Sequence, residues 1–379
     1  MADNKDKKVL NVPALRFPEF TEGWATKSIS DLATVIGGGT PDTTVKSYWN
    51  GDIQWFTPSE IGKNKYVDLS LRTITEEGLN NSSAKLLPPY TILLSSRATV
   101  GECSIALQEC ATNQGFQSLI AKNCDMDFLY YLIQTKKKEL IRKACGSTFL
   151  EISANEIRKI HTYVPSINEQ KKIGVLLSLI DKRIATQNKI IEKLGTLIKG
   201  IRDYVLNNKL QNTTKKKLGE LCTITTGKLD ANAMKSEGLY PFFTCAEDVY
   251  RIDSFAFDTE ALLVSGYGAN LGYIHYYKGK FNAYQRTYVL SNFIEDIHYI
   301  QIYLEAYLHK RIALEKSTSN TPYIVLATLA EMPIIIPNIK IQKDISNKIL
   351  ILKSKLITEI HIRNCYKDMR QFLLSQMFI

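Results

Sequence analysis

The sequence predicts a mixed α/β (α+β) fold, in which two globular domains alternate with two long helices that pair as an antiparallel coiled coil. Three observations carry this prediction: strand-like segments recur in the same order, one helix entrance occurs twice, and apolar heptads follow each entrance. At 379 residues, the chain is long enough for two domains of ordinary size. We expect the first domain at residues 1–165, the central helix at 166–212, the second domain at 213–337 and the distal helix at 338–379.

The duplication starts near the beginning of each half. The stretches "KSISDLATVIGGGTP" from Lys27 and "KLGELCTITTGKLD" from Lys217 both read as a short strand, a turn anchored by Leu, and a loop rich in Gly and Thr. Further along, "ILLSSRATVGECSIAL" from Ile92 aligns with "LLVSGYGANLGYIHYY" from Leu262, and "ATNQGFQSLI" aligns with "NAYQRTYVLS". Amphipathic segments that are typical of helices follow in both halves. We therefore expect two copies of one fold.

The two copies differ in length at one place. The offset between matching residues is 189 from Ile29 to Leu218, but only 171 from Gln114 to Gln285. The second copy is therefore 18 residues shorter between the first loop and the central strands. Loops that change length on a fixed scaffold are typical of recognition surfaces, although neutral drift of loop length gives the same pattern.

Each copy ends in the same helix entrance. The stretches "VPSINEQKKI" from Val164 and "IPNIKIQKDI" from Ile336 both place Gln five residues after Pro. A proline at this point ends the preceding strand and sets the corner from which the helix starts. The apolar positions of the first helix then follow a heptad seam through Ile173, Leu177, Ile180, Ile184, Ile191, Leu194, Ile198, Ile201 and Val205.

Neither helix can bury its apolar stripe alone, so we expect the two to pack on each other, with the chain order making the pair antiparallel. The alternative is that each helix folds back onto its own domain. Gln187 of the first seam falls at the position of Glu359 in the second, where a buried polar pair would fix the alignment. At an offset of 172, the second seam keeps the register of the first through Ile345, Ile349, Leu352 and Leu356.

Charge and cysteine content narrow the class of function. The formal net charge of +10 indicates an acidic partner, with nucleic acid ahead of a membrane surface or a protein patch. A soluble protein that is merely basic is the alternative. The seven cysteines form no CxxC pair, so neither a disulfide framework nor a zinc site is indicated, and a reducing cytoplasm fits best. The N-terminal "MADNKDKK" is unlike a signal peptide, and no membrane span is expected.

Three stretches give the chain a family resemblance: "GGGTPDTTVKSYWNGDIQWFTPSEI" from Gly37, "ATNQGF" from Ala111, and "VPSINEQKKI" with its second copy. Over nearly its whole length the chain resembles the specificity (S) subunits of Type I restriction–modification systems. Members of that family carry two target recognition domains that alternate with two conserved helical regions. The second half departs from the pattern, because "TTGKLDANAMKSEGLYPFFTCAED" lacks both tryptophans of the first.

The resemblance implies a DNA-binding protein of phage defence that recognises a bipartite, asymmetric target in double-stranded DNA. It also implies two methyltransferase (M) subunits and restriction (R) subunits as partners, which would hold S-adenosylmethionine and ATP with Mg²⁺. Two different recognition domains imply a target that is not palindromic, because identical domains would read identical halves. No cofactor and no metal are expected in this chain.

No residue set for catalysis is indicated. The stretch "LPPY" from Leu87 resembles the Asn/Asp-Pro-Pro-Tyr/Phe loop of adenine methyltransferases, but Leu87 cannot accept the hydrogen bond that the polar first residue accepts there. No GxxxxGK[ST] motif occurs, so the usual phosphate-binding loop for ATP is absent from the sequence. The five histidines show no spacing of metal ligands. The sequence therefore predicts a protein that is not an enzyme.

Base recognition in the major groove needs hydrogen-bonding side chains on exposed loops. In the first domain, the loops after two expected strands offer Ser96, Arg97, Thr99, Asn113 and Gln114. The aligned places in the second domain hold Tyr267, Asn270, Tyr284, Gln285 and Arg286. Candidate phosphate contacts, which position the protein without reading sequence, are Lys63, Lys65 and Lys228. The alternatives are a solvated turn charge for Arg97 and turn capping for Asn113 and Gln114.

Two other classes of function stay open on sequence alone. One is a two-domain coiled-coil DNA-binding protein of another system, such as an architectural or antitoxin-like protein, with no methyltransferase partner. The other is a structural coiled-coil adaptor. Methyltransferase activity that arises only with a partner chain would support a specificity subunit against both. Outside the seam, Leu176, Leu179 and Ile190 are candidates for gripping such a partner or for further packing inside the helix pair.

Overall fold

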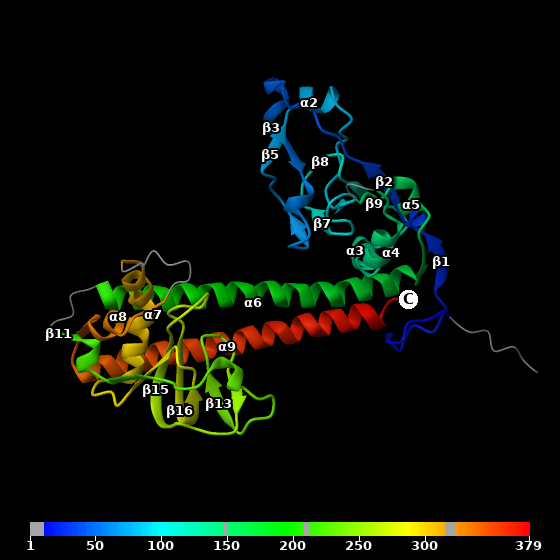
Figure 1. The fold of residues 1–379 in the computed structure, drawn as a ribbon. Coiled ribbons are helices and arrows are strands. Elements are labelled where there is room, and N and C mark those ends of the chain that lie inside the picture. Colours follow the sequence, from blue (N-terminus) through cyan, green and yellow to red (C-terminus); the bar gives the residue numbers. More distant parts are fainter. Residues whose placement is uncertain (1–10, 147–149, 208–212, 315–322) are drawn as a thin grey trace, which may run out of the picture. The chain divides into compact units, whose positions relative to one another are not determined.

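The computed structural model describes residues 11–146, 150–207, 213–314 and 323–379 (Figure 1). It confirms the mixed α/β class, and its two long helices are α6 (Ile167–Asn207) and α9 (Ile339–Gln376). None of the helices in the described ranges is long and apolar enough to span a bilayer.

The chain divides into two compact units, Met1–Asn188 with His361–Ile379, and Lys189–Ile360. Each unit holds one globular domain and a part of both long helices. The domain boundaries expected from the sequence stay a prediction, since residues 1–10 and 208–212, where two of the segments begin or end, lie outside the described ranges.

The described residues of the first unit form three small sheets. The five-stranded sheet has the order β2 (Ala33–Gly37), β9 (Gln117–Ala121), β6 (Ile92–Leu94), β7 (Cys103–Ala106) and β4 (Tyr66–Val67). The other two sheets are β5 (Arg72–Ile74), β3 (Trp49–Phe56) and β8 (Cys110–Thr112), and the pair β1 (Ala25–Ser28) and β10 (His161–Val164). The helices of this domain are α1 (Ile29–Leu32), α2 (Glu76–Asn80), α3 (Met126–Thr135), α4 (Lys137–Lys143) and α5 (Ala154–Arg158), with 3₁₀ turns at Lys46–Tyr48 and Pro58–Glu60.

The core of the first unit joins the domain to the helix pair. Phe128 of α3 is fully buried and stacks on Phe378, just beyond α9, with ring centroids 5.2 Å apart. Ile173 and Leu177, the first two seam residues of α6, are buried in the same cluster. The start of α6 therefore packs on its own domain as well as in the helix pair, so the two arrangements expected as alternatives coexist here.

The second unit repeats the first with one larger sheet. Its order is β12 (Thr223–Thr226), β17 (Thr287–Ser291), β15 (Phe257–Ser265), β16 (Ile274–Ala283), β13 (Tyr240–Phe243) and β14 (Tyr250–Ile252). A separate pair is formed by β11 (Thr214–Lys217) and β18 (Pro333–Ile336). The helices of the domain are α7 (Ile297–Leu314) and α8 (Leu326–Ala330), with 3₁₀ turns at Leu218–Glu220 and Ala231–Ala233.

The long helices pair in the antiparallel sense that the chain order predicted. In the first unit the beginning of α6 lies beside the end of α9, where Arg370 Nε donates to Asp181 Oδ1 at 2.5 Å. In the second unit the end of α6, at Ile198, packs on the cluster that buries Ile345 near the beginning of α9. The seam residues whose side chains the structure describes are buried or half-buried, whereas the side chain of Val205 lies outside that part.

The repeated helix entrance has a hydrogen-bonding role. Gln170 is buried, and its Nε2 donates to the carbonyl oxygen of Pro165 at 2.9 Å, which ties the helix to the corner before it. Its Oε1 accepts from the N–H of Asp125 at 2.9 Å. Asp125 in turn caps α3, because its carboxylate accepts from the N–H of Phe128. One glutamine thus joins the strand exit, the long helix and the next helix of the domain.

The second entrance repeats these bonds. Gln342 Nε2 donates to the carbonyl oxygen of Pro337 at 2.8 Å, and its Oε1 accepts from the N–H of Asp296 at 3.1 Å. Asp296 caps α7 by accepting from the N–H of Tyr299 at 2.8 Å. The spacing of Pro and Gln therefore occurs twice because each domain is fastened to a long helix by the same buried amide.

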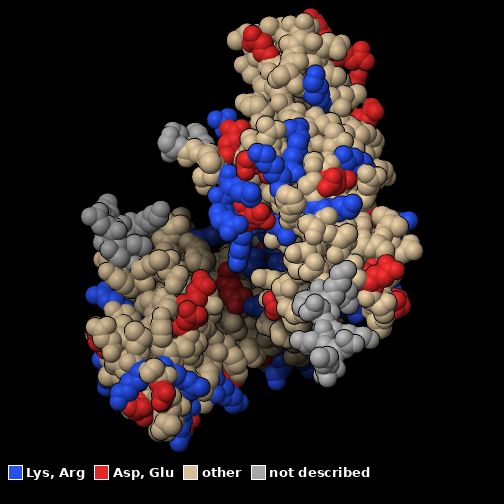
Figure 2. Space-filling model, turned by 90° about the vertical axis from the view of Figure 1, so that its right-hand side faces the viewer, with Lys and Arg blue, Asp and Glu red and all other residues tan. Residues whose placement is uncertain are grey.

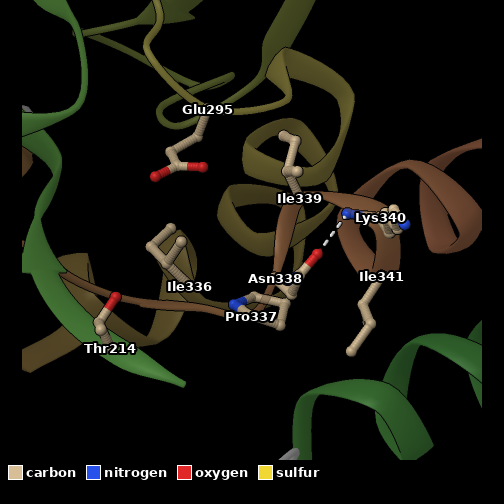
Figure 3. Close-up of a pocket in the computed structure, with 8 residues that line it drawn as sticks. All are labelled: Thr214, Glu295, Ile336, Pro337, Asn338, Ile339, Lys340 and Ile341. Atoms are coloured by element: carbon tan, nitrogen blue, oxygen red, sulfur yellow. Dashed lines mark hydrogen bonds between the residues drawn. The ribbon is translucent and has the colours of Figure 1, made fainter. Parts of the chain in front are cut away.

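A hollow of about 570 Å³ lies at the second entrance (Figure 3). Glu295 faces it, and its carboxylate accepts from Gln342 Nε2 at 2.8 Å and pairs with Lys216 at 3.6 Å. Its charged group is thus already engaged in the helix entrance. The remaining lining is Thr214, Ile336, Pro337, Asn338, Ile339, Lys340 and Ile341.

Candidate nucleic-acid interface

In the first domain, loops from four strands meet at one place. The N–H of Gly39, after β2, donates to the carbonyl oxygen of Thr112 at the end of β8 at 2.8 Å. The N–H of Asn113 donates to the carbonyl oxygen of Phe56 at the end of β3 at 3.1 Å. The N–H of Ser96, after β6, donates to the carbonyl oxygen of Gly115 at 2.8 Å. We call residues 38–40, 57–60, 95–99 and 112–115 the first loop cluster.

Glycine allows this close approach. A Cβ added to Gly38 would lie 2.0 Å from the carbonyl oxygen of Asn113, which no other residue tolerates. Trp55 supports the same loop, because its Nε1–H donates to the carbonyl oxygen of Gly39 at 3.0 Å. Trp49 Nε1–H donates to the carbonyl oxygen of Asp42 at 3.1 Å. The two tryptophans of the sequence motif thus hold the loop that begins with the glycines.

The predicted base-contact residues of the first domain differ in exposure. Arg97 is 43% exposed and pairs with Glu151 at 3.5 Å, while Thr99 and Gln114 are exposed. Asn113 caps its turn, because its Oδ1 accepts from the N–H of Gly115 at 2.9 Å. The expected alternative of turn capping is thus realised for Asn113, in a place that still lies within the cluster.

Ser96 and Lys65 are less accessible than the other predicted contacts. Ser96 is fully buried beneath the cluster. The Lys65 side chain is 8% exposed, and its ammonium pairs with Asp127 at 2.6 Å. Lys63 and Lys228, the other predicted phosphate contacts, are exposed.

In the second domain, the equivalent loops meet in the same way. The N–H of Tyr284 donates to the carbonyl oxygen of Phe243 at 2.9 Å, and the N–H of Gly266 donates to that of Arg286 at 2.9 Å. A Cβ at Gly227 would lie 1.9 Å from the carbonyl oxygen of Ala283, so this glycine repeats the role of its counterpart in the first domain. We call residues 227–229, 244–246, 265–270 and 284–286 the second loop cluster.

The second cluster carries different side chains on this backbone. The guanidinium carbon of Arg286 lies 4.4 Å from the ring centroid of Tyr267, a cation–π contact. Asn270 Nδ2 donates to the carbonyl oxygen of Cys245 at 3.2 Å. Gln285 and Arg286 are exposed, whereas the predicted contacts Tyr267, Asn270 and Tyr284 are half-buried.

Each cluster therefore holds one arginine, delivered by a different loop. The matching bonds of Ser96 to Gly115 and of Gly266 to Arg286 align Gly115 with Arg286, and Arg97 with Tyr267. A Cβ at Gly115 would lie 3.7 Å from the Cβ of Arg97, so the two positions are neighbours in space.

Sequence reasoning missed residues that belong to the first cluster. Thr40 Oγ1 donates to Gln114 Oε1. A Cβ at Gly115 would lie 3.0 Å from Pro58 Cγ, which places the Thr57-Pro58 turn in the cluster as well. Both segments are Thr-Pro pairs that stand in the quoted motif from Gly37, and this recurrence was the available signal.

Two groups next to the first loop cluster have shifted pKa values. Burial raises the pKa of the Cys110 thiol in β8 to about 12, so this cysteine is not a nucleophile at neutral pH. Hydrogen bonds from Thr44 lower the pKa of the exposed Asp42 carboxyl. Within the described ranges, no group of His, Cys, Asp and Glu is placed to hold a metal ion. On the face shown in Figure 2, Lys and Arg side chains are interspersed with Asp and Glu.

The chain thus has two domains of one architecture, each with its own set of hydrogen-bonding side chains on converging loops. A family model described as Type I restriction modification DNA specificity domain matches the chain twice, at residues 21–196 and 211–363. The chain belongs to this family: it is a specificity subunit of a Type I restriction–modification system, a DNA-recognition component and not a catalytic one.

Individual relatives agree with this assignment. The specificity subunit of the type I restriction enzyme MjaIX from Methanocaldococcus jannaschii is 29% identical over 401 residues, covering 93% of this chain and 92% of its own. That of EcoDI from Escherichia coli is 42% identical over 132 residues, covering 35% and 29%. A crystal structure of the S subunit of a Type I restriction–modification system from M. genitalium matches the fold with a TM-score of 0.70 at 18% identity, covering 97% of this chain and 99% of its own.

Proposed function

We propose that this chain reads a bipartite, asymmetric target in double-stranded DNA, one half-site with each loop cluster. The observation that carries the proposal is the repeated backbone with changed side chains. The same hydrogen bonds converge the loops in both domains, yet Arg97 stands where the second domain has Tyr267, and Gly115 where it has Arg286. A fixed frame with different donors and acceptors suits two different base sequences.

Within each cluster the exposed side chains take different roles. Arg97, Arg286 and Gln114 present groups suited to guanine or adenine edges in the major groove. Lys63 and Lys228 are exposed and serve as phosphate contacts, which fix register without reading bases. Ser96 and Lys65 belong to the support of the cluster, since Ser96 is buried and the Lys65 side chain is only 8% exposed.

The long helices set the separation of the half-sites and receive the partner subunits. Leu179, outside the seam of α6, is 56% exposed and offers an apolar contact for a methyltransferase subunit. Leu176 packs on the first core and Ile190 is half-buried, so both contribute less to such a surface. Two M subunits and the R subunits would supply S-adenosylmethionine and ATP with Mg²⁺, and the assembly would act in the cytoplasm.

An exchange of one domain tests this function. Residues 217–335 are replaced by the matching segment of a related specificity subunit, and methylated adenines are mapped across the genome of a host that also carries the methyltransferase subunit. We expect one half of the target to change while the other half stays as in the unaltered chain. A change of both halves together would contradict independent reading by the two domains.

A further inference from the structure

We propose that Lys65 is a positioning residue that fixes the first loop cluster on the long helices, and thereby sets how strictly the distance between the two half-sites is measured. This inference rests on the proposed function, because it concerns the spacing of a bipartite target. It gives a role to a lysine whose sequence context suggested a phosphate contact.

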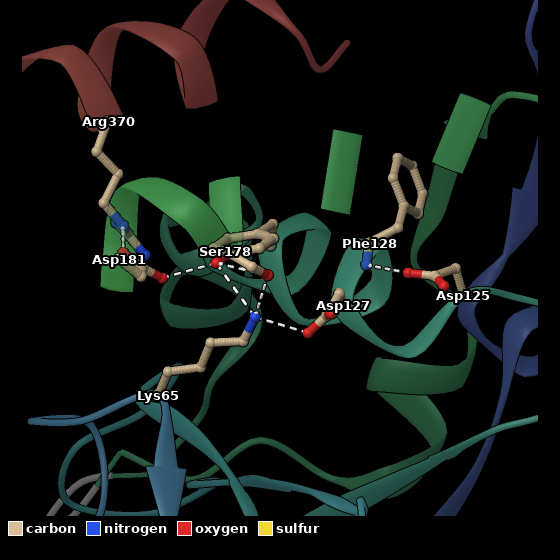
Figure 4. A network of polar contacts seen from close by, with 8 residues as sticks. Lys65, Asp125, Asp127, Phe128, Ser178, Asp181 and Arg370 are labelled. Carbon is tan, nitrogen blue, oxygen red and sulfur yellow. Dashed lines mark hydrogen bonds and ion pairs between the residues drawn. The ribbon is translucent and has the colours of Figure 1, made fainter. Parts of the chain in front are cut away.

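The Lys65 ammonium reaches from a domain loop into a polar network on the helices (Figure 4). Its Nζ donates to Ser178 Oγ of α6 at 2.6 Å and to the hydroxyl of Tyr131 on α3 at 3.2 Å. It also pairs with the carboxylate of Asp127 on α3 at 2.6 Å. These partners use the three donors of the ammonium, and they lie on two different helices.

The network continues into the second long helix. The hydroxyl of Tyr131 donates to Asp181 Oδ2 of α6 at 2.7 Å. Arg370 of α9 donates to Asp181 Oδ1 at 2.5 Å and to Gln134 Oε1 of α3 at 2.7 Å. One chain of hydrogen bonds thus runs from the domain loop through α3 to both long helices. Networks of this kind hold a single geometry, because loss of any member leaves a buried polar group unpaired.

The segment that carries Lys65 leads directly from the loop cluster. Thr57 and Pro58 lie in the cluster, and the chain then crosses to β4, where the N–H of Ile105 donates to the carbonyl oxygen of Lys65 at 2.7 Å. Ser104 Oγ fixes the same stretch, donating to the carbonyl oxygen of Asn64 at 2.7 Å. Residues 57–65, which we call the strap, therefore form one short, hydrogen-bonded connection between the first loop cluster and the helices.

The described residues of the second unit show a more direct attachment of the domain to the helices. At the positions of Gln134 and Asp181 it has Glu305 and Lys353, which pair directly from α7 to α9 at 2.8 Å. The strap of the first domain lies in the stretch that is longer in the first domain than in the second. Lys65 is thus an additional attachment, and its loss should loosen the angle of the first domain rather than unfold it.

The test compares Lys65→Met and Ser178→Ala with Lys138→Met, an exposed lysine of α4, in the complete complex with the methyltransferase subunits. Methyl transfer is measured on duplexes whose half-sites stand at the natural spacing and at one base pair more or less. We expect the preference for the natural spacing to fall about tenfold in Lys65→Met, with unchanged half-site bases, because the interaction lost involves a charged group. Ser178→Ala should shift the preference in the same direction, and Lys138→Met should match the unaltered chain.

An unchanged spacing profile in an intact Lys65→Met complex would overturn the inference. So would equal loss on all duplexes with a weaker dependence on salt, since that is the behaviour of a phosphate contact. If the unaltered complex shows no two-part target, the proposed function fails instead. In that case, amide hydrogen exchange tests whether Lys65 attaches the domain to the helices, independently of the target. The N–H of Ile105 should exchange about tenfold faster in Lys65→Met than in the unaltered chain, and an equal rate would refute the attachment.

Discussion

At the scale of single residues, the two arginines of the loop clusters illustrate how one backbone frame presents side chains from different loops. Arg97 comes from the loop after β6 and Arg286 from the loop before β17, yet their positions are neighbours when the repeats are compared. Arg97 pairs with Glu151, whereas Arg286 lies on the ring of Tyr267. The guanidinium groups are thus oriented by different partners, and we expect them to reach different bases.

Substitution of either arginine should relax the preference at one base position. Loss of a bidentate contact to guanine costs about 1–3 kcal/mol, so Arg97→Ala and Arg286→Ala should affect opposite halves of the target by that amount. The measurement is binding to a panel of duplexes with single-base changes, at several salt concentrations. Lys228→Ala is the control, because a phosphate contact weakens binding to all sequences alike. If an arginine variant behaves like this control, that arginine contacts the DNA backbone and not a base.

The buried glutamines at the two helix entrances should matter for stability. Gln170→Ala leaves the carbonyl oxygen of Pro165 and the N–H of Asp125 without their partner, which costs about 1–3 kcal/mol in the free energy of unfolding. Gln371→Ala, at an exposed position of α9, should leave stability unchanged. Urea unfolding followed by circular dichroism gives both values. Equal stability of the two variants would show that water replaces the amide at the entrance.

At the scale of elements, the two faces of α6 should respond differently to truncation. Leu177 is fully buried in the first core, so Leu177→Ala should cost about 2–5 kcal/mol of stability. Leu179→Ala should cost little, since this residue is 56% exposed, but it should weaken the complex with the methyltransferase subunit. Thermal unfolding of the free chain and titration with the partner subunit separate the two effects. If Leu179→Ala binds the methyltransferase subunit normally, the partner surface lies elsewhere on the chain.

The long helices could be predicted from sequence because a heptad pattern depends only on residues close together in the chain, such as those that follow Ile173. The repeated glycine loops likewise marked where strands end. The burial of Ser96 and of the Lys65 side chain could not be predicted in this way. Each is buried by segments far away in the sequence, Ser96 beside Gly115 and Lys65 against Ser178. Burial of a polar residue in a loop depends on packing partners that no local pattern names.

At the scale of the whole molecule, the length of the helix pair should set the distance between the two half-sites. Seven residues inserted after Asn188 in α6, with seven after Ile360 in α9 to keep the heptads paired, would lengthen the pair by about 10 Å at 1.5 Å per residue. The spacer of the target should then grow by about three base pairs of 3.4 Å each. Methylome mapping reports the new spacer and both half-sites. Altered half-sites with an unchanged spacer would show that the helices do not set the spacer length.

The pairing of the first and last strand of each domain has a consequence for how such proteins change over generations. Ala25 stands opposite Val164, and Thr214 stands opposite Ile336. The first and last strands of each domain are therefore adjacent, so the chain enters and leaves each domain at neighbouring points. A genetic exchange with breakpoints in these two strands would insert a foreign domain without moving either helix. Under the proposed function, a population would acquire a new half-site in one recombination event, while the helices that we propose as the partner surface would be inherited unchanged.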